Sequence, residues 1–94
     1  MMIKLKKYAL IFKALAHETR LAILYGLLDG DGCNVSKIVE TLNLPQPTIS
    51  QHLTVLKSAK IIEGYKKGSE ICYNVVNKLA VKLLEEMRTT DEKN

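Results

Sequence analysis

Both prolines of this 94-residue chain lie in one stretch, NLPQPTISQHLTVLKSAKII at residues 43–62, and they are two positions apart. Pro45 disfavours helical geometry at the residue before it, so a helix that precedes this stretch has to end there. Pro47 falls in the first turn of a helix expected from about Gln46 to Ser58, where backbone N–H groups have no partner within the helix. The two prolines therefore predict a turn that leads directly into a helix.

The helix expected at about 46–58 has one apolar side and one uncharged polar side. Because successive residues are about 100° apart on a helix, Ile49, Leu53 and Leu56 lie together and predict the buried side. The polar side and its edges carry Pro47, Thr48, Ser50, Gln51, His52, Thr54, Val55, Lys57 and Ser58, and no acid occurs from 46 to 62. Short neutral donors and acceptors suit approach to phosphates and base edges in a DNA major groove. The alternative is a plain amphipathic helix that has few charges.

The rest of the chain predicts further helices and one hairpin. In order, we expect a first helix, a second that begins near His17 or Glu18 and ends at DGDG, a short strand, a third capped by Ser36, the helix at about 46–58, a β-hairpin, and a last helix capped by Asn77. The expected class is mainly α with a small β-hairpin (α+β). One domain at 1–88 is expected, with a disordered tail at 89–94.

Apolar spacing predicts one apolar side on each of these helices. The sets are Leu5, Tyr8, Ala9, Phe12 and Leu15, then Leu21, Leu24, Leu27 and Leu28, then Ile38, Val39 and Leu42, which are expected to face inward, and finally Leu79, Leu83, Leu84 and Met87. In the hairpin, Ile71, Tyr73 and Val75 alternate with Glu70, Cys72 and Asn74. A turn is expected at Lys67 and Gly68.

The hairpin tip, YKKGS, places Lys66 and Lys67 beside a turn glycine. Together with a net charge of +4 and a pI near 9.1, these lysines favour an anionic partner and suit contact with a DNA backbone. A solvated hairpin tip would also carry lysines. The order of turn, polar helix and basic hairpin is more specific than any one of these parts.

Three segments resemble the ArsR (arsenic-repressor-like) family of winged helix-turn-helix transcriptional regulators: FKALAHETRLAIL, VSKIVETLNLPQPTISQHLTVLKSAKII and KKGSEICYNV. The resemblance implies a homodimer paired through its first and last helices. It implies a recognition helix at about 46–58 in the major groove of an operator, and a wing at about 61–75 along the backbone. The expected function is sequence-specific transcriptional regulation, as a dimeric repressor. The residues expected to contact DNA are Gln46, Pro47, Thr48, Ser50, Gln51, His52, Thr54, Lys57, Lys66 and Lys67.

Metal sites that the resemblance implies lack their ligands in this sequence. One falls on Asn34 and Ser36, and the other on the last helix, which contains no His or Cys. Zinc and copper favour imidazole or thiolate ligands, so we expect no metal and no cofactor.

The two cysteines, Cys33 and Cys72, are too few for a disulfide scaffold and show no Cys-x-x-Cys spacing. Inert cysteines in a reduced, intracellular setting are the simplest interpretation. A redox- or sulfide-responsive repressor that uses both cysteines is the alternative. It requires their Cα atoms to lie within about 7 Å of each other.

Apolar residues on the first and last helices exceed what a 94-residue monomer easily covers. The predicted dimer interface consists of Leu5, Tyr8, Phe12, Leu79, Leu83 and Met87. Packing of these side chains within one subunit is the alternative.

Other classes of function fit the sequence less well. No nucleophile–base–acid set or phosphate loop occurs, so an enzyme is not expected. A winged-helix module that binds other proteins remains a second alternative. We expect a cytoplasmic protein without membrane contact, because neither a signal peptide nor a run of about 18 apolar residues is present.

Overall fold

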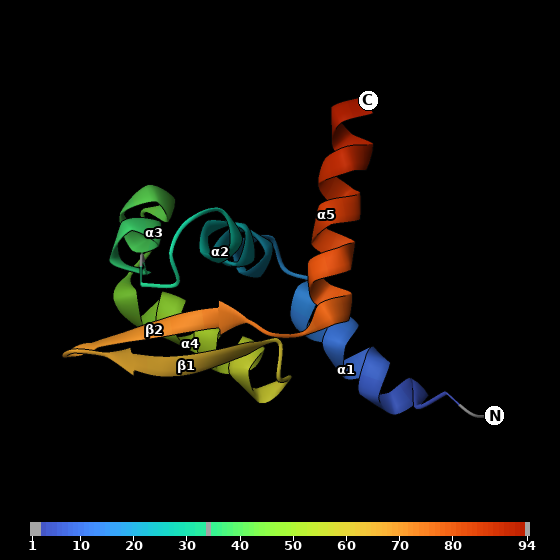
Figure 1. Ribbon diagram of the computed structural model, residues 1–94, viewed down its shortest axis with the longest axis horizontal. Helices are drawn as coiled ribbons and strands as arrows, with labels where there is room; N and C mark the ends of the chain where they lie inside the picture. Colours follow the sequence, from blue (N-terminus) through green and yellow to red (C-terminus); the bar gives the residue numbers. More distant parts are fainter. Residues whose placement is uncertain (1–2, 34, 94) are drawn as a thin grey trace.

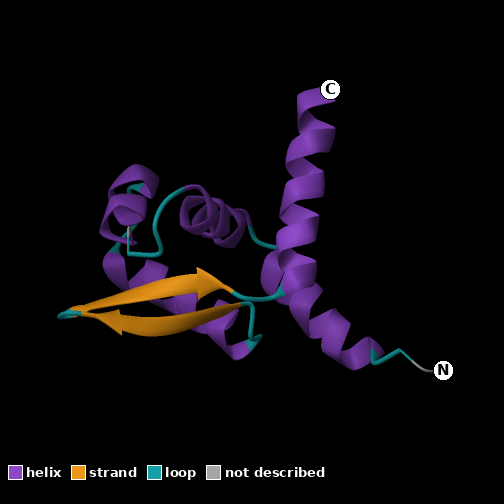
Figure 2. Cartoon of the chain, in the orientation of Figure 1, coloured by secondary structure: helices purple, strands orange, loops and turns teal. Residues whose placement is uncertain are grey.

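The computed structural model describes residues 3–33 and 35–93, which form five helices and a two-stranded hairpin (Figure 2). In chain order the elements are α1 (Leu5–Leu15), α2 (Glu18–Asp29), α3 (Val35–Leu42), α4 (Gln46–Ser58), β1 (Ile62–Lys67), β2 (Glu70–Val75) and α5 (Lys78–Lys93). The mainly helical fold with one hairpin between the fourth and last helices is confirmed. The tip of the hairpin and α5 lie on opposite sides of the molecule (Figure 1).

Aliphatic side chains from the helices and from the base of the hairpin form one core. The largest fully buried residues are Ile23, Leu24, Ile49, Leu56, Ile61, Ile62, Leu84 and Cys72. α2 lies at the centre, because α1, α3, α4 and β2 all contact it. Burial on several sides explains why Ile23, outside the predicted stripe, is buried while Leu28 is exposed.

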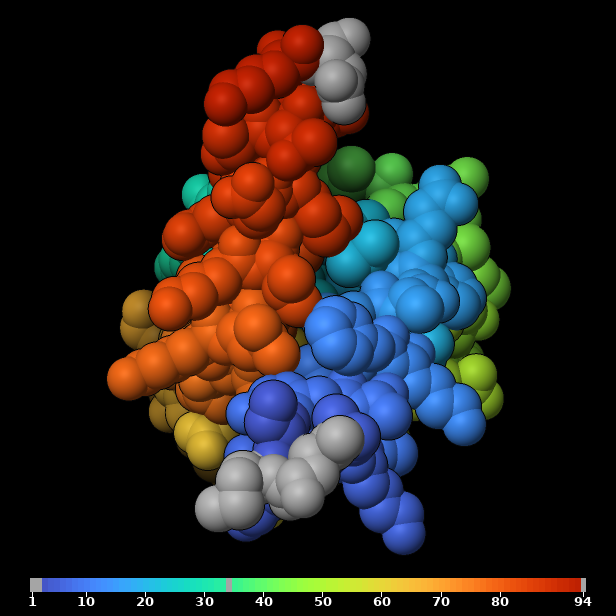
Figure 3. All heavy atoms as spheres, turned by 90° about the vertical axis from the view of Figure 1, so that its right-hand side faces the viewer, coloured from blue at the N-terminus to red at the C-terminus, as the bar shows by residue number. Residues whose placement is uncertain are grey.

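The buried side of α1 shares only Leu15 with the apolar side that the spacing predicted. Its buried residues are Ile11, Ala14 and Leu15, whereas Leu5 and Phe12 are 57% and 51% exposed. α1 and α5 both lie on the face of the molecule that is turned away from the hairpin tip (Figure 3). The apolar residues of α1 therefore divide between the core of the subunit and an exposed surface.

The segment between α2 and α3 differs from the prediction. Val35 already belongs to α3, so the expected short strand is absent from the described residues, and Ser36 is an exposed residue of the first turn, not the cap. Asn34 lies outside the described residues. The loop nevertheless touches the hairpin, because the carbonyl of Gly32 accepts a hydrogen bond of 2.8 Å from the Tyr73 N–H.

The hairpin pairs β1 and β2 in antiparallel register, from Ile62 opposite Val75 to Lys67 opposite Glu70. Gly68 follows β1 with φ of +64°, a left-handed conformation that glycine adopts without steric cost. Inward and outward positions on β2 differ from the expected alternation, since Ile71 is 57% exposed and Cys72 is fully buried. The Gly32 loop lies against this strand and contributes to covering Cys72.

α5 begins at a side-chain cap and is held against α2. The Asn77 side-chain oxygen accepts a hydrogen bond of 2.9 Å from the Ala80 N–H, as predicted. Further along, the Tyr25 hydroxyl donates to the Leu84 carbonyl over 2.5 Å, and Arg88 forms a 2.9 Å ion pair with Asp29. The helix continues through Lys93, so residues 89–93, expected as a disordered tail, are helical. None of the helices in the described ranges is both long and apolar enough to cross a membrane.

The cap at Asn77 leads to a stability prediction. Asn77→Ala should lower the free energy of unfolding by about 1 kcal/mol, because the Ala80 N–H loses its partner at a half-buried helix start. Urea unfolding at a fixed protein concentration measures this difference. Asn74→Ala, at an exposed position of the wing, is the matched control and should change the midpoint little. Equal midpoints for Asn77→Ala and Asn74→Ala would contradict the assigned cap.

Candidate nucleic-acid interface

The connection between α3 and α4 is the tight turn that the two prolines predicted. Asn43 ends α3 with φ of +52°, a conformation that Asn tolerates, and its N–H donates to the Val39 carbonyl over 2.9 Å. Pro45 is extended, with φ of −59° and ψ of 143°, and its carbonyl accepts the Thr48 N–H over 3.0 Å. α4 begins at Gln46, so Pro47 lies in the first turn, where its missing N–H removes no helical hydrogen bond.

α4 has the two sides that the sequence predicted. Ile49, Leu53 and Leu56 are buried, which fixes the rotation of the helix about its axis. The exposed residues are Gln46, Pro47, Ser50, Gln51, Thr54, Val55, Lys57 and Ser58. Among the other positions predicted to face DNA, Thr48 and His52 are half-buried. The exposed side is therefore polar, carries no acid, and is held at a fixed orientation by the core.

Two side-chain hydrogen bonds order the first half of this exposed side. Gln46 Nε2 donates to Ser50 Oγ over 3.4 Å, and Thr54 Oγ1 donates to the Ser50 carbonyl over 2.9 Å. The Thr54 hydroxyl oxygen keeps acceptor capacity, and the Gln46 amide keeps its carbonyl oxygen. These groups offer donors and acceptors from a rigid helix.

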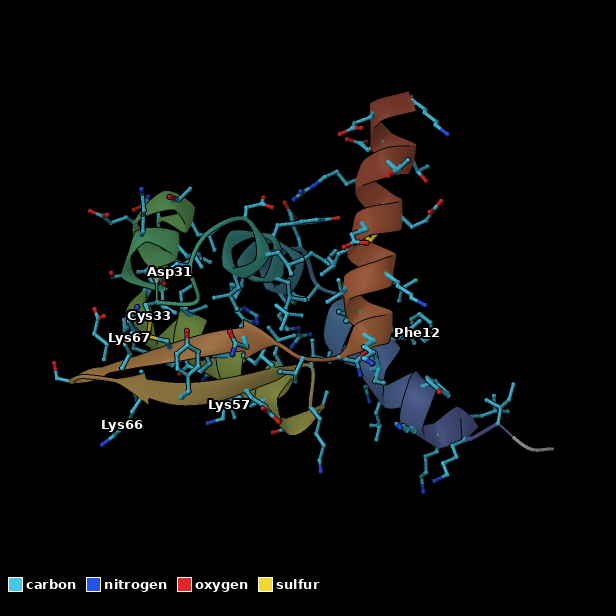
Figure 4. The ribbon with its side chains drawn as sticks, in the orientation of Figure 1. Phe12, Asp31, Cys33, Lys57, Lys66 and Lys67 are labelled. Atoms are coloured by element: carbon cyan, nitrogen blue, oxygen red, sulfur yellow. A yellow bond between two sulfur atoms is a disulfide. The ribbon has the colours of Figure 1, made fainter. Side chains whose placement is uncertain are left out.

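Three exposed lysines belong to the hairpin and to α4. Lys66 and Lys67 lie on the hairpin close to its tip, and Lys57 is in the last turn of α4 (Figure 4). β1 packs against α4, so hairpin and helix form one continuous structure. The arrangement combines a polar helix with exposed cations on an adjoining hairpin, which is suited to an anionic polymer.

His52 contacts the start of α2. Its ring centroid lies 4.5 Å from that of His17, at an interplanar angle of 51°. His17 is the cap of α2, because its Nδ1 accepts a 3.1 Å hydrogen bond from the Thr19 N–H. Arg20 is half-buried, and its Nε has no hydrogen-bond partner among the described residues. Desolvation, followed by the nearby charges of His17 and Arg20, lowers the pKa of His52 below its usual 6.5.

This lowered pKa leads to a pH prediction. The folded chain binds a proton at His52 less readily than the unfolded chain, so stability should fall as pH drops below about 6.5 and level off below the folded pKa. His52→Gln should remove part of this loss. Urea midpoints at about pH 7.5 and pH 5 measure it. The prediction fails if wild type and His52→Gln lose the same stability between the two pH values.

Cys33 and Cys72 form a disulfide, with their Cα atoms 4.3 Å apart. The prediction of free, inert cysteines therefore differs from the structure, whereas the distance required by the redox alternative is met. Glu70 lies close by, and its carboxylate and the two sulfurs all fall within 4.8 Å of one another. Two thiolates and a carboxylate would form a metal-binding set, but bonded sulfurs are not thiolates and do not supply it.

The sequence did not predict the contacts that Cys33 makes with its neighbours. Asp31 Oδ1 accepts a 2.7 Å hydrogen bond from the Cys33 N–H, and the Tyr65 hydroxyl lies 3.8 Å from Cys33 Sγ. DGDG predicted only a helix end and a turn. No local pattern indicated that this turn would meet the hairpin, since the contact joins segments far apart in the chain.

The helix α3, a tight turn, the exposed helix α4 and a two-stranded wing together define a winged helix-turn-helix, a class of DNA-binding transcriptional regulator. Residues 17–63 match the family described as "Bacterial regulatory protein, arsR family". An HTH-type transcriptional regulator of Methanocaldococcus jannaschii is 43% identical over 87 residues, which cover 89% of this chain and 98% of that protein. The chain belongs to the ArsR family, whose members are transcriptional regulators and not enzymes.

Solved structures agree with this assignment. The transcriptional repressor PagR of Bacillus anthracis superposes with a TM-score of 0.79 at 32% identity, over 88% of this chain and 94% of PagR. A homodimeric winged helix-turn-helix DNA-binding domain from Mycobacterium bovis gives a TM-score of 0.81 at 27% identity, over 95% of this chain and 82% of that domain. The similarity therefore covers the first and last helices as well as the helix-turn-helix.

Proposed function

We propose that this chain is a homodimeric, cytoplasmic repressor that binds a double-stranded operator. Each subunit inserts α4 into the major groove and lays the wing formed by β1 and β2 along the backbone. The residues that contact DNA are those predicted from the sequence on α4, together with Lys66 and Lys67. No metal or cofactor is required for this binding. Repressor function is supported by the similarity to PagR.

One observation carries this proposal: α4 presents an acid-free polar side to solvent while its opposite side is locked into the core. Ile49 and Leu56 have no exposed surface, so the helix does not rotate to offer another face. Gln51 and Ser50 lie on the exposed side, and an exposed Gln can make two hydrogen bonds to one base edge. A surface of this kind reads base edges, whereas the wing lysines add attraction that is independent of sequence.

Apolar surface on α1 and α5 supports the homodimer. Phe12 and Met87 are 51% and 43% exposed and line one apolar groove with Leu83. Leu5 is exposed as well, and Tyr8 and Leu79 are half-buried. A second copy of the chain would cover these residues. The homodimeric relative from Mycobacterium bovis is similar over 95% of this chain, which supports a homodimer here as well.

Mutations should distinguish the base contacts expected of α4 from the backbone contacts expected of the wing. Gln51→Ala should weaken binding to an operator, selected from a random duplex pool, by about 1–3 kcal/mol while it leaves binding to unrelated duplexes unchanged. Lys66→Ala with Lys67→Ala should weaken binding to all duplexes and lower the salt slope by about 2 per subunit. Titrations by fluorescence anisotropy at several salt concentrations measure both effects.

Lys82→Ala with Lys93→Ala is the matched control, because it removes the same charge from exposed positions of α5. It should change operator affinity much less than the wing variant does. The DNA-binding proposal is wrong if the wild type binds no duplex in a salt-dependent manner. Capture of a protein partner through the exposed side of α4, with no DNA binding, would favour the protein-interaction alternative.

The dimer proposal has its own matched pair of variants on one helix. Phe12→Glu should shift the protein towards monomer, because a charge would be buried at the interface of α1 and α5. Leu10→Glu places the same charge at a residue that is 58% exposed but lines a different groove, beside Val55 and Ser58 of α4. Sedimentation at several concentrations should find a dimer for wild type and Leu10→Glu. A wild-type mass of one subunit at all concentrations would contradict the proposal.

A further inference from the structure

The disulfide joins two parts of the proposed DNA-binding surface. Cys33 lies in the loop that leads into α3, two residues before that helix begins, and Cys72 lies in the middle of β2. The bond therefore connects the start of the helix-turn-helix directly to the wing. These segments are 39 residues apart in sequence, so folding alone brings the two cysteines together.

Contacts other than the disulfide also hold the loop against the wing. The Gly32 carbonyl accepts the Tyr73 N–H of β2 over 2.8 Å, and the Tyr65 hydroxyl of β1 lies 3.8 Å from Cys33 Sγ. Within the loop, the Cys33 N–H donates to Asp31 Oδ1 over 2.7 Å. Gly32 permits this approach, because a Cβ at that position would collide with the Tyr73 carbonyl oxygen. The two thiols of a reduced chain would therefore already lie close together, which favours rapid closure of the bond.

The two cysteines differ in access to solvent. Cys33 is half-buried, whereas Cys72 has no exposed surface. A dissolved oxidant such as a peroxide reaches Cys33 first, and Cys72 serves as the resolving thiol. The Cys33 thiolate attacks one peroxide oxygen and breaks the O–O bond, which gives a sulfenic acid and, after proton uptake, one water. The Cys72 thiol then attacks that sulfur and releases a second water.

The balance of this reaction is two thiols and one hydrogen peroxide giving one disulfide and two waters. The sulfurs lose two electrons, and the peroxide oxygens gain them. A dithiol reductant reverses the change by thiol–disulfide exchange and becomes a disulfide itself.

We propose that Cys33 and Cys72 form a reversible, oxidant-responsive bond between the helix-turn-helix and the wing, and that closing it raises operator affinity. The affinity part of this inference rests on the proposed function. The physical reason is preorganisation: a wing bonded to the loop before α3 has less freedom to lose when it settles on the DNA backbone. In the reduced protein, Lys66 and Lys67 occupy more positions relative to α4, so fewer phosphate contacts form at once.

The full-length protein tests the bond and its effect separately. The folded protein is treated with dithiothreitol or hydrogen peroxide and is then unfolded in the presence of an alkylating reagent. Both cysteines should react after dithiothreitol, neither should react after hydrogen peroxide, and the cycle should repeat. The oxidised form should bind the selected operator about 5-fold more tightly than the reduced form, with a steeper salt dependence. Cys33→Ser should match the reduced wild type with or without peroxide. Cys72→Ala gives the same test at the buried position without adding a polar group.

A pair of glycine variants tests whether the contact between Gly32 and Tyr73 holds the two reduced thiols close together. Gly32→Ala should slow closure of the bond by about 10-fold or more, because the added Cβ forces the loop away from Tyr73. Gly30→Ala, in the same loop but with an ordinary extended φ of −121°, should close at the wild-type rate. Equal closure rates for the two variants would show that this contact does not hold the thiols close together.

Failure of the inference is distinguishable from failure of the proposed function. A bond that dithiothreitol cannot open in the folded protein, or thiols that peroxide cannot join, would overturn the reversible bond. An operator that both redox forms bind within 2-fold of each other, or that the oxidised form binds more weakly, would overturn the affinity effect alone. A chain whose bond opens and closes but that binds no duplex in either form would overturn the proposed function.

Discussion

Burial of one side of α4 is the constraint on which the rest of the structure depends. Ile49 and Leu56 have no exposed surface, and Ile61 and Ile62, immediately after the helix, are buried with them. Because the chain enters the hairpin from this buried segment, β1 starts in the core and its far end projects into solvent. The same packing thus orients the exposed side of α4 and sets the direction of the wing.

The two ends of the subunit expose side chains of different kinds. The end with α4 and the hairpin tip is polar and carries lysines, whereas the end with α1 and α5 exposes apolar side chains such as Phe12 and Met87. α2 lies between them and contacts both. Its Tyr25 and Asp29 bind Leu84 and Arg88 of α5, and its cap residue His17 packs against His52 of α4. A protomer divided in this way can pair with a second copy while both polar helices stay free.

Local signals in the sequence were sufficient for the helix-turn-helix but not for the contacts between distant segments. Pro45, Pro47 and the spacing of Ile49, Leu53 and Leu56 predicted α4 to the residue, because turn chemistry and helical periodicity act over a few positions. The burial of Cys72 was not predictable, since it depends on the Gly32 loop, which approaches β2 from 40 residues away. Likewise, the burial of Ile11 in α1 was not predictable, because two apolar sides share that helix and only packing distinguishes them.

The bond between Cys33 and Cys72 also divides the molecule topologically. It closes residues 33–72 into a covalent ring that contains α3, the turn, α4, β1 and the tip of the wing. All ten residues proposed to contact DNA lie inside this ring, and all six proposed for the dimer interface lie outside it. The disulfide limits the conformations of the unfolded chain between the two cysteines. It therefore stabilises the fold of the segment that would meet the operator. A single backbone cleavage within the ring would open a loop and leave both fragments joined through sulfur.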